Sequence, residues 1–139
     1  EERAKKRSDK GEFWWELRPC AYYDDFEKPK IIYAEIARNG KFILDLNQHY
    51  SSDTTYIISK LEVTEYHYLL GILNSELFTK IFSHTGSQIR GGYLRWKGQY
   101  MEKMPIPTAS ETDRARLIGL VQKQLAYHAE LGGLEKAQS

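Results

Sequence analysis

Residues 89–97 carry the side chains best suited to binding a nucleic acid. The segment reads Ile-Arg-Gly-Gly-Tyr-Leu-Arg-Trp-Lys, which places three cations and two aromatic rings around a Gly-Gly pair that frees the backbone. An arginine can set its planar fork on phosphates or guanine edges, and a ring can stack on a sugar or base. Between Lys80 and Met104 there are five basic residues and one acidic residue, a local charge of +4 in a chain of net charge +1. This concentration favours nucleic-acid contact, and the alternative is a Gly-Gly turn between short strands with solvated cations.

The common catalytic and metal-binding patterns are missing from the sequence. None of the four histidines has a Cys or His neighbour at metal-ligand spacing. A restriction-type nuclease site needs an acid two residues before a lysine, and the nearest pattern here is Glu16 with Arg18. The Pro-Pro loop that an adenine methyltransferase uses for a flipped base is absent, and so is a Phe-x-Gly-x-Gly cofactor loop. The sequence therefore predicts no catalytic residue, no metal site and no cofactor of its own.

Composition indicates one globular domain. The chain has 139 residues, of which 41% are hydrophobic, and it is too nearly neutral to bind DNA except through a local patch. A single cysteine, Cys20, cannot form an internal disulfide, which predicts a cytoplasmic protein. No apolar run is long enough for a membrane span. The charged first ten residues contain no signal peptide and no initiator Met, so we expect a piece of a longer polypeptide.

Hydrophobic periodicity predicts the elements that position these side chains. Residues 30–36, 41–45 and 54–59 are rich in β-branched and aromatic residues and indicate strands, with a hairpin signal at Asn39-Gly40. The helical period then predicts helices over 64–74 and 75–84. Residues 93–96 are expected to be extended, and Trp14, Trp15 and Trp96 to lie in the core. The fold class is therefore α+β, a small antiparallel or mixed sheet with helices packed on one face and a C-terminal helix.

The C-terminal helix is predicted to begin near Ser110, which has a capping partner at Asp113. Its apolar residues recur at spacings of three and four, and a Gly-Gly pair at 132–133 is expected to stop or fray it. The apolar stripe is narrow. The helix therefore either packs on the domain or forms half of a coiled coil, with a helix partner through residues 111–131.

Three segments, in this order and spacing, resemble a known family. They are Tyr-Tyr-Asp-Asp-Phe-Glu-Lys-Pro-Lys-Ile-Ile-Tyr at 22–33, Tyr-Leu-Leu-Gly-Ile-Leu-Asn-Ser at 68–75, and Ile-Arg-Gly-Gly-Tyr at 89–93 continuing to Lys-Met-Pro-Ile-Pro at 103–107. Together they closely resemble the TaqI-like C-terminal specificity domain, the target-recognition domain of adenine-N6 DNA methyltransferases and fused restriction–modification enzymes. The chain is also similar to the recognition domains of type I restriction specificity subunits.

This resemblance implies a division of the chain and of the reaction. Residues 1–12 would be a charged connector from an upstream methyltransferase domain that uses S-adenosylmethionine. Residues 13–108 would recognise the target in double-stranded DNA, lying across its major groove. Residues 109–139 would be a spacer or packing helix. The expected partners are DNA and the methyltransferase domain of the same polypeptide. The parent polypeptide would be a methyltransferase with or without a fused endonuclease.

Candidate DNA contacts follow from this function. Members of such a family read different sequences, so shared motif residues should serve the fold or the phosphates, and base reading should fall to the loops. The predicted phosphate contacts are Lys28, Lys30, Lys41, Arg90, Arg95 and Lys97. The predicted base-reading residues are Arg38, Asn39, His49 and Gln88. For each of these the alternative is a solvated loop residue.

Two other functions compete with target recognition. One is a protein-docking module of a restriction–modification complex that does not read bases, which would lack the steep salt dependence of DNA binding. The other is a nuclease subunit, against which the missing acid-x-Lys pattern already argues.

Overall fold

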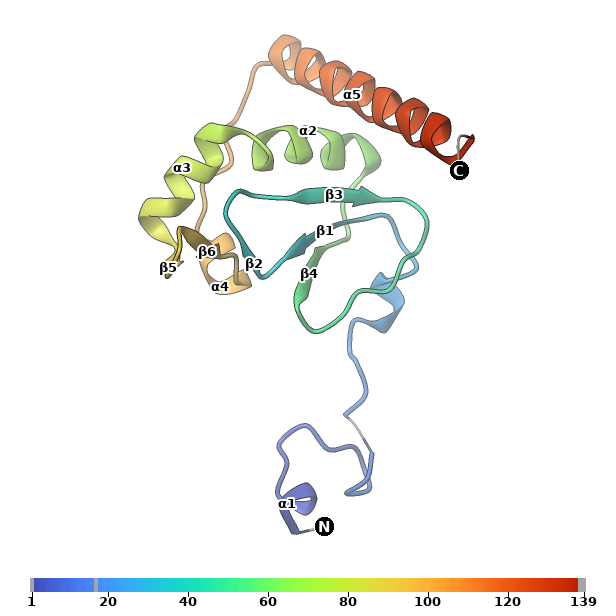
Figure 1. The fold of residues 1–139 in the computed structure, drawn as a ribbon, viewed down its shortest axis with the longest axis vertical. Coiled ribbons are helices and arrows are strands. Elements are labelled where there is room, and N and C mark those ends of the chain that lie inside the picture. Colours follow the sequence, from blue (N-terminus) through green and yellow to red (C-terminus); the bar gives the residue numbers. More distant parts are fainter. Residues whose placement is uncertain (1, 17, 138–139) are drawn as a thin grey trace.

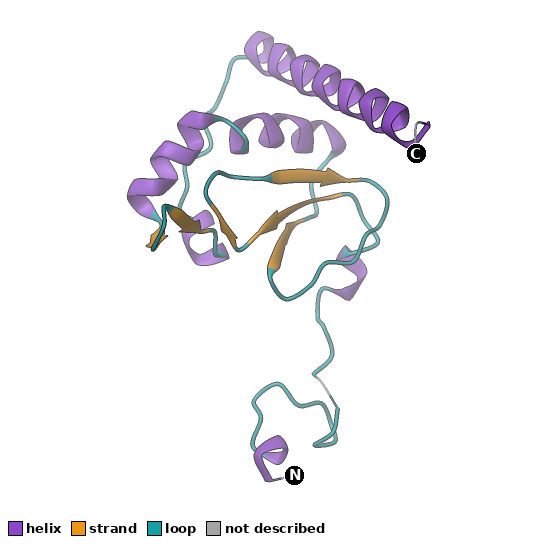
Figure 2. Cartoon of the chain, viewed as in Figure 1, coloured by secondary structure: helices purple, strands orange, loops and turns teal. Residues whose placement is uncertain are grey.

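The body of the protein consists of two small antiparallel sheets and the helices beside them (Figures 1 and 2). The computed structural model describes residues 2–16 and 18–137. In chain order the elements are α1 (Glu2–Lys5), the 3-10 turn η1 (Tyr23–Asp25), β1 (Lys30–Ala34), β2 (Ile36–Ala37), β3 (Phe42–Asp45), β4 (Thr55–Ile58), α2 (Val63–Leu73), α3 (Glu76–Thr85), β5 (Ser87–Ile89), β6 (Tyr93–Arg95), α4 (Gly98–Met101) and α5 (Glu111–Ala137). The predicted α+β class is confirmed.

The first sheet contains the three strands that the sequence predicted. Its order is β3-β1-β4, and both pairings are antiparallel. Side chains of neighbouring positions point to opposite faces of a strand, and Ile31 and Tyr33 are both buried in the main core. Phe42 lies opposite Tyr33 in β3, and the two rings are 5.1 Å apart. This sheet supplies one wall of the core.

The second sheet was not predicted as a sheet. Its order is β2-β6-β5, so residues 36–37 leave the first sheet and pair with β6. The tight hairpin predicted at Asn39-Gly40 is therefore wrong, although β1 and β3 do pair antiparallel. The expected Gly-Gly turn is present between β5 and β6, where Gly91 and Gly92 have φ values of +88° and +78° that favour glycine.

Helix α2 lies between the first sheet and α5 (Figure 1). A Cβ atom at Gly71 of α2 would lie 2.9 Å from side-chain carbons of Leu117 and Val121, so glycine permits the close approach of α5. The helix α5 continues to Ala137, so of the predicted stop or fraying at residues 132–133 the stop is wrong. Glycine lowers helix propensity without forbidding a helix. Within the described part of the chain, no helix is long and apolar enough to cross a membrane.

Trp96 is the largest side chain in the core, as predicted. Its ring stacks on Phe82 at 4.0 Å, meets Phe42 edge-on, and donates from Nε1 to the carbonyl of Ala37 at 3.1 Å. The same expectation is wrong for Trp15, whose exposed fraction is 62%, and for Trp14, which is half-buried outside the core cluster. Trp15 stacks on Phe13 within the N-terminal segment, which extends away from the body (Figure 1). Cys20 is also exposed.

Candidate nucleic-acid interface

A groove of about 640 Å³ gathers four of the predicted DNA contacts. It lies between the loop at residues 38–41, one side of α3 and the β5–β6 hairpin. The predicted residues that line it are Arg38, Asn39, Lys41 and Gln88. These come from two segments about 50 residues apart in the sequence, and the fold brings them to one surface.

The loop at residues 38–41 is anchored through its main chain. A Cβ at Gly40 would lie 2.5 Å from the ring of Phe42, and the Gly40 amide donates to Thr79 Oγ1 at 3.3 Å. The amide of Phe42 donates to Asn74 Oδ1 at 3.1 Å, and Asn74 Nδ2 donates back to the Phe42 carbonyl at 2.9 Å. Asn74 and Thr79 therefore hold the loop through its main chain, and the side chains at positions 38, 39 and 41 take no part in these hydrogen bonds.

Two side chains of the groove are held by partners across it or beside it. Gln88 Nε2 donates to the carbonyl of Ser83 at 2.9 Å, which ties β5 to α3. The guanidinium carbon of Arg38 lies 5.0 Å from the centre of the Tyr93 ring, within range of a cation–π interaction. Both contacts restrict the directions in which these polar groups can point.

The charge of the groove is mostly positive and mostly unpaired. Its charged residues are Arg38, Lys41 and Lys80 on the basic side, with Glu76 the acidic exception. In the part of the chain that the structure describes, none of these four forms an ion pair within 4.0 Å. Unpaired cations that converge on one hollow create a surface that attracts polyanions.

Lys30 lies in the interior, so the prediction that it contacts a phosphate is wrong. Its exposed fraction is 0%, and its ammonium donates to Asp45 at 2.5 Å and to the carbonyl of Phe26 at 2.6 Å. Burial raises the pKa of the Asp45 carboxyl, but hydrogen bonds from Lys30, from His49 and from backbone amides outweigh it and hold that pKa well below its ordinary value.

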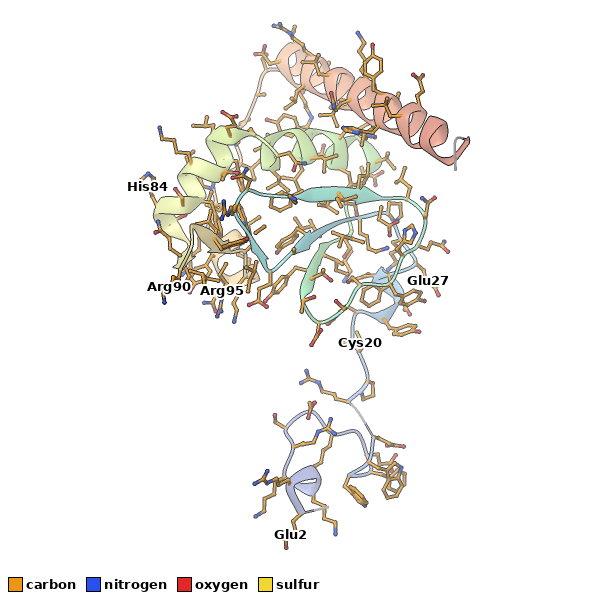
Figure 3. All side chains as sticks on the ribbon, in the orientation of Figure 1. Glu2, Cys20, Glu27, His84, Arg90 and Arg95 are labelled. Atoms are coloured by element: carbon orange, nitrogen blue, oxygen red, sulfur yellow. The ribbon has the colours of Figure 1, made fainter. Side chains whose placement is uncertain are left out.

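His49 and Lys28 lie outside the groove. The His49 ring bonds to Asp45 through Nδ1 at 2.7 Å, and its amide donates to the same carboxylate. Lys28 pairs at 3.0 Å with the buried Asp25, which also binds Lys60. The hydrogen bond from Lys28 lowers the pKa of Asp25. In Figure 3, Glu27 marks this region, and Arg90 and Arg95 mark the opposite end of the body.

The remaining predicted cations lie near the groove without lining it. Arg95 Nε and Lys97 Nζ approach Glu35 at 3.7 and 3.8 Å, and Arg95 Nε has no hydrogen-bond partner among the described residues. Arg90 is exposed in the β5–β6 turn, next to the two glycines. Glu35 thus neutralises part of the charge that the sequence suggested for this region.

Among the groove residues that were not predicted contacts, three carry a charge or an aromatic ring. They are Glu76 and Lys80 of α3 and Tyr93 of β6. A signal for the helical pair is present in the sequence, because the helical period places Phe78 and Phe82 on the inner face and residues 76 and 80 on another side of the same helix. For Tyr93 the missing information is the pairing of β2 with β6, which depends on residues far apart in sequence.

Two tyrosine hydroxyls of α2 bond to the first and third of the segments that carried the resemblance, and α2 also contains most of the second segment. Tyr66 donates to the carbonyl of Pro29, and Tyr68 donates to the carbonyl of Pro107, both at 2.7 Å. These segments therefore form the frame on which the groove is built. A family model described as TaqI-like C-terminal specificity domain matches residues 2–106, which include the whole groove. No curated protein matches the sequence.

Proposed function

The chain belongs to the family of TaqI-like C-terminal specificity domains, and we propose on this basis that it recognises the DNA target of a restriction–modification adenine-N6 methyltransferase. In this proposal the chain selects the sequence and performs no catalysis. A methyltransferase domain upstream in the same polypeptide, which would bind S-adenosylmethionine, flips and methylates the adenine.

The observation that carries the proposal is that predicted contact residues from separate segments line one groove. The loop at residues 38–41 and strand β5 supply neutral hydrogen-bonding side chains, Asn39 and Gln88, of the kind that read base edges. The loop and α3 add the cations Lys41 and Lys80, of the kind that bind phosphates. We propose Arg90, Arg95 and Lys97 as flanking phosphate contacts, because they belong to the adjoining hairpin and the residues after it.

The proposed roles of the chain's three parts keep the predicted boundaries. Residues 1–12 connect to the methyltransferase domain, residues 13–108 bind the target, and residues 109–139 form a spacer or packing helix. The contact of α5 with α2 at Gly71 supports a packing role. Exposed Leu120, Tyr127 and Leu131 on the same helix support an additional helix partner.

The second candidate function is a docking module that reads no bases. The exposed apolar residues of α5 favour this alternative, since exposed apolar side chains often mark a site where another protein binds. Under this alternative, the cations of the groove are incidental to function.

The deciding experiment selects bound sequences from a random duplex library with the intact protein at about 150 mM salt, where non-specific binding is weak. Target recognition predicts enrichment of one short motif. A properly folded protein that enriches no motif would support the docking module and contradict our proposal. DNA cleavage by this chain alone with magnesium would contradict both.

A further inference from the structure

We infer that Arg38, seated on the ring of Tyr93, reads a guanine of the target through its major-groove edge. This inference rests on the proposed function and adds the identity of one base and a positioning residue. It follows from the sheet register, from the unoccupied donors of Arg38 and from the chemistry of the groove.

The pairing of β2 with β6 brings the two side chains together. Ala37 lies opposite Leu94 in an antiparallel ladder, so the next residues outward, Arg38 and Tyr93, are a cross-strand pair. The guanidinium carbon lies 5.0 Å from the Tyr93 ring centre. Residue 93 therefore gives the arginine a flat platform at the end of a hydrogen-bonded sheet.

The donors of Arg38 remain available to a ligand. Its side chain is exposed, and among the described residues it has no carboxylate within 4.0 Å and donates no hydrogen bond to protein. Arg95 and Arg114 differ in this respect, since Arg95 faces Glu35 and Arg114 bonds to Glu65. Arg38 thus has both an oriented plane and a free hydrogen-bonding edge.

Guanine is the base that this edge fits. Its major-groove edge offers two acceptors, N7 and O6, which match the parallel N–H groups of a guanidinium, whereas adenine offers one acceptor beside a donor. Arg38 shares the groove with the amides of Asn39 and Gln88, side chains of the kind that read base edges. Lys41 and Lys80 supply the charge for the flanking backbone.

The first test repeats the library selection with variants of the intact protein. Arg38→Ala is expected to relax one guanine position by roughly 5–150-fold and to leave the other positions unchanged. Arg38→Lys keeps the charge but lacks the fork, so it should relax the same position while keeping its affinity for random DNA. Tyr93→Ala should weaken that position by about 2–5-fold, and Tyr93→Phe, which keeps the ring, should match the wild type.

The second test changes single atoms of the DNA. Replacing the selected guanine by 7-deazaguanine removes N7 and should weaken binding of the wild type but not of Arg38→Ala. Inosine keeps N7 and O6 and should bind both proteins as guanine does. Thermal unfolding of each variant confirms that the exposed substitution leaves the fold intact.

The outcomes separate this inference from the proposed function. If Arg38→Ala weakens all sequences equally, Arg38 contacts the backbone, and the inference fails while target recognition stands. If the relaxed position is not a guanine, or if 7-deazaguanine has no effect, the inference also fails. If the wild type enriches no motif, target recognition itself is contradicted.

Discussion

Lys30 and Asp45 form an ion pair inside the protein, and we expect the folded state to depend on it. Lys30→Met would leave the Asp45 carboxylate buried without its main partner, so the free energy of unfolding should fall by about 3–5 kcal/mol. Urea denaturation measures this change. Lys41→Met is the control, because Lys41 is exposed in a loop and should shift stability by less than about 0.5 kcal/mol. Equal effects at both positions would contradict a buried ion pair at Lys30.

The lowered pKa of Asp45 predicts an acid sensitivity. A carboxyl whose pKa is lower in the folded protein stabilises it above the unfolded pKa, near 4, and this contribution is lost as the pH falls from there toward the folded value. Asp45→Asn removes the titrating group. The urea midpoint of the wild type should therefore fall more steeply between pH 5 and pH 2.5 than that of the variant, and parallel curves would argue against this role.

The sequence could not distinguish Lys30 from the surface lysines near it. Lys28 and Lys30 flank a proline in the same motif, yet Lys28 is exposed and Lys30 is buried. The difference arises from the register of β1 and β3, in which Lys30 lies directly opposite Asp45. That register sets the partner of the charge, and it depends on the connection through the second sheet.

At the scale of elements, the contact between α2 and α5 depends on Gly71. Gly71→Leu would force side-chain atoms into Leu117 and Val121, so stability should fall by about 1–3 kcal/mol and amide exchange in α5 should accelerate. Hydrogen exchange with mass spectrometry reports the second effect.

Gly119→Ala is the matched control for Gly71. Gly119 lies in α5, and a Cβ atom there would have no neighbour within 4 Å. The higher helix propensity of alanine alone should therefore raise the free energy of unfolding by about 0.5–1 kcal/mol. Destabilisation at both glycines would mean that α5 does not pack as described.

Elements with a strong local period were predictable, and elements made by distant pairing were not. Strands β1, β3 and β4 and helices α2 and α3 each have a hydrophobic pattern that follows from burial of one face. Strands β2 and β5 have two and three residues, too few to show a period, and they exist because β6 pairs with both. The hairpin signal at residues 39–40 failed for the same reason.

At the scale of the whole molecule, the groove predicts how salt affects DNA binding. Removing one lysine that neutralises a phosphate should reduce the slope of log affinity against log salt by about 1, so Lys41→Ala with Lys80→Ala should reduce it by about 2. Lys123→Ala on α5 is the control and should leave the slope unchanged. A slope that the double variant does not alter would remove these lysines from the interface.

The candidate site was predictable in part. Residues 38, 39, 41 and 88 could be selected because they were expected to lie in loops, which carry variable polar side chains, and the fold brings them together. Gln88 lies in β5 and not in a loop. His49 satisfied the same criterion but lies on the Asp45 carboxylate, outside the groove. No local pattern specifies which loops share a surface, because that depends on how the two sheets are connected.

Thr79 and Asn74 hold the loop at residues 38–41 by hydrogen bonds to main-chain atoms, namely the amide of Gly40 and the amide and carbonyl of Phe42. Side chains at positions 38, 39 and 41 take no part in these bonds. The side chains of such a loop can therefore be substituted without loss of the hydrogen bonds that hold its backbone. Under the proposed function, retargeting the protein to a new DNA sequence calls for exchange of a few side chains, with Asn74, Thr79 and Gly40 left as they are.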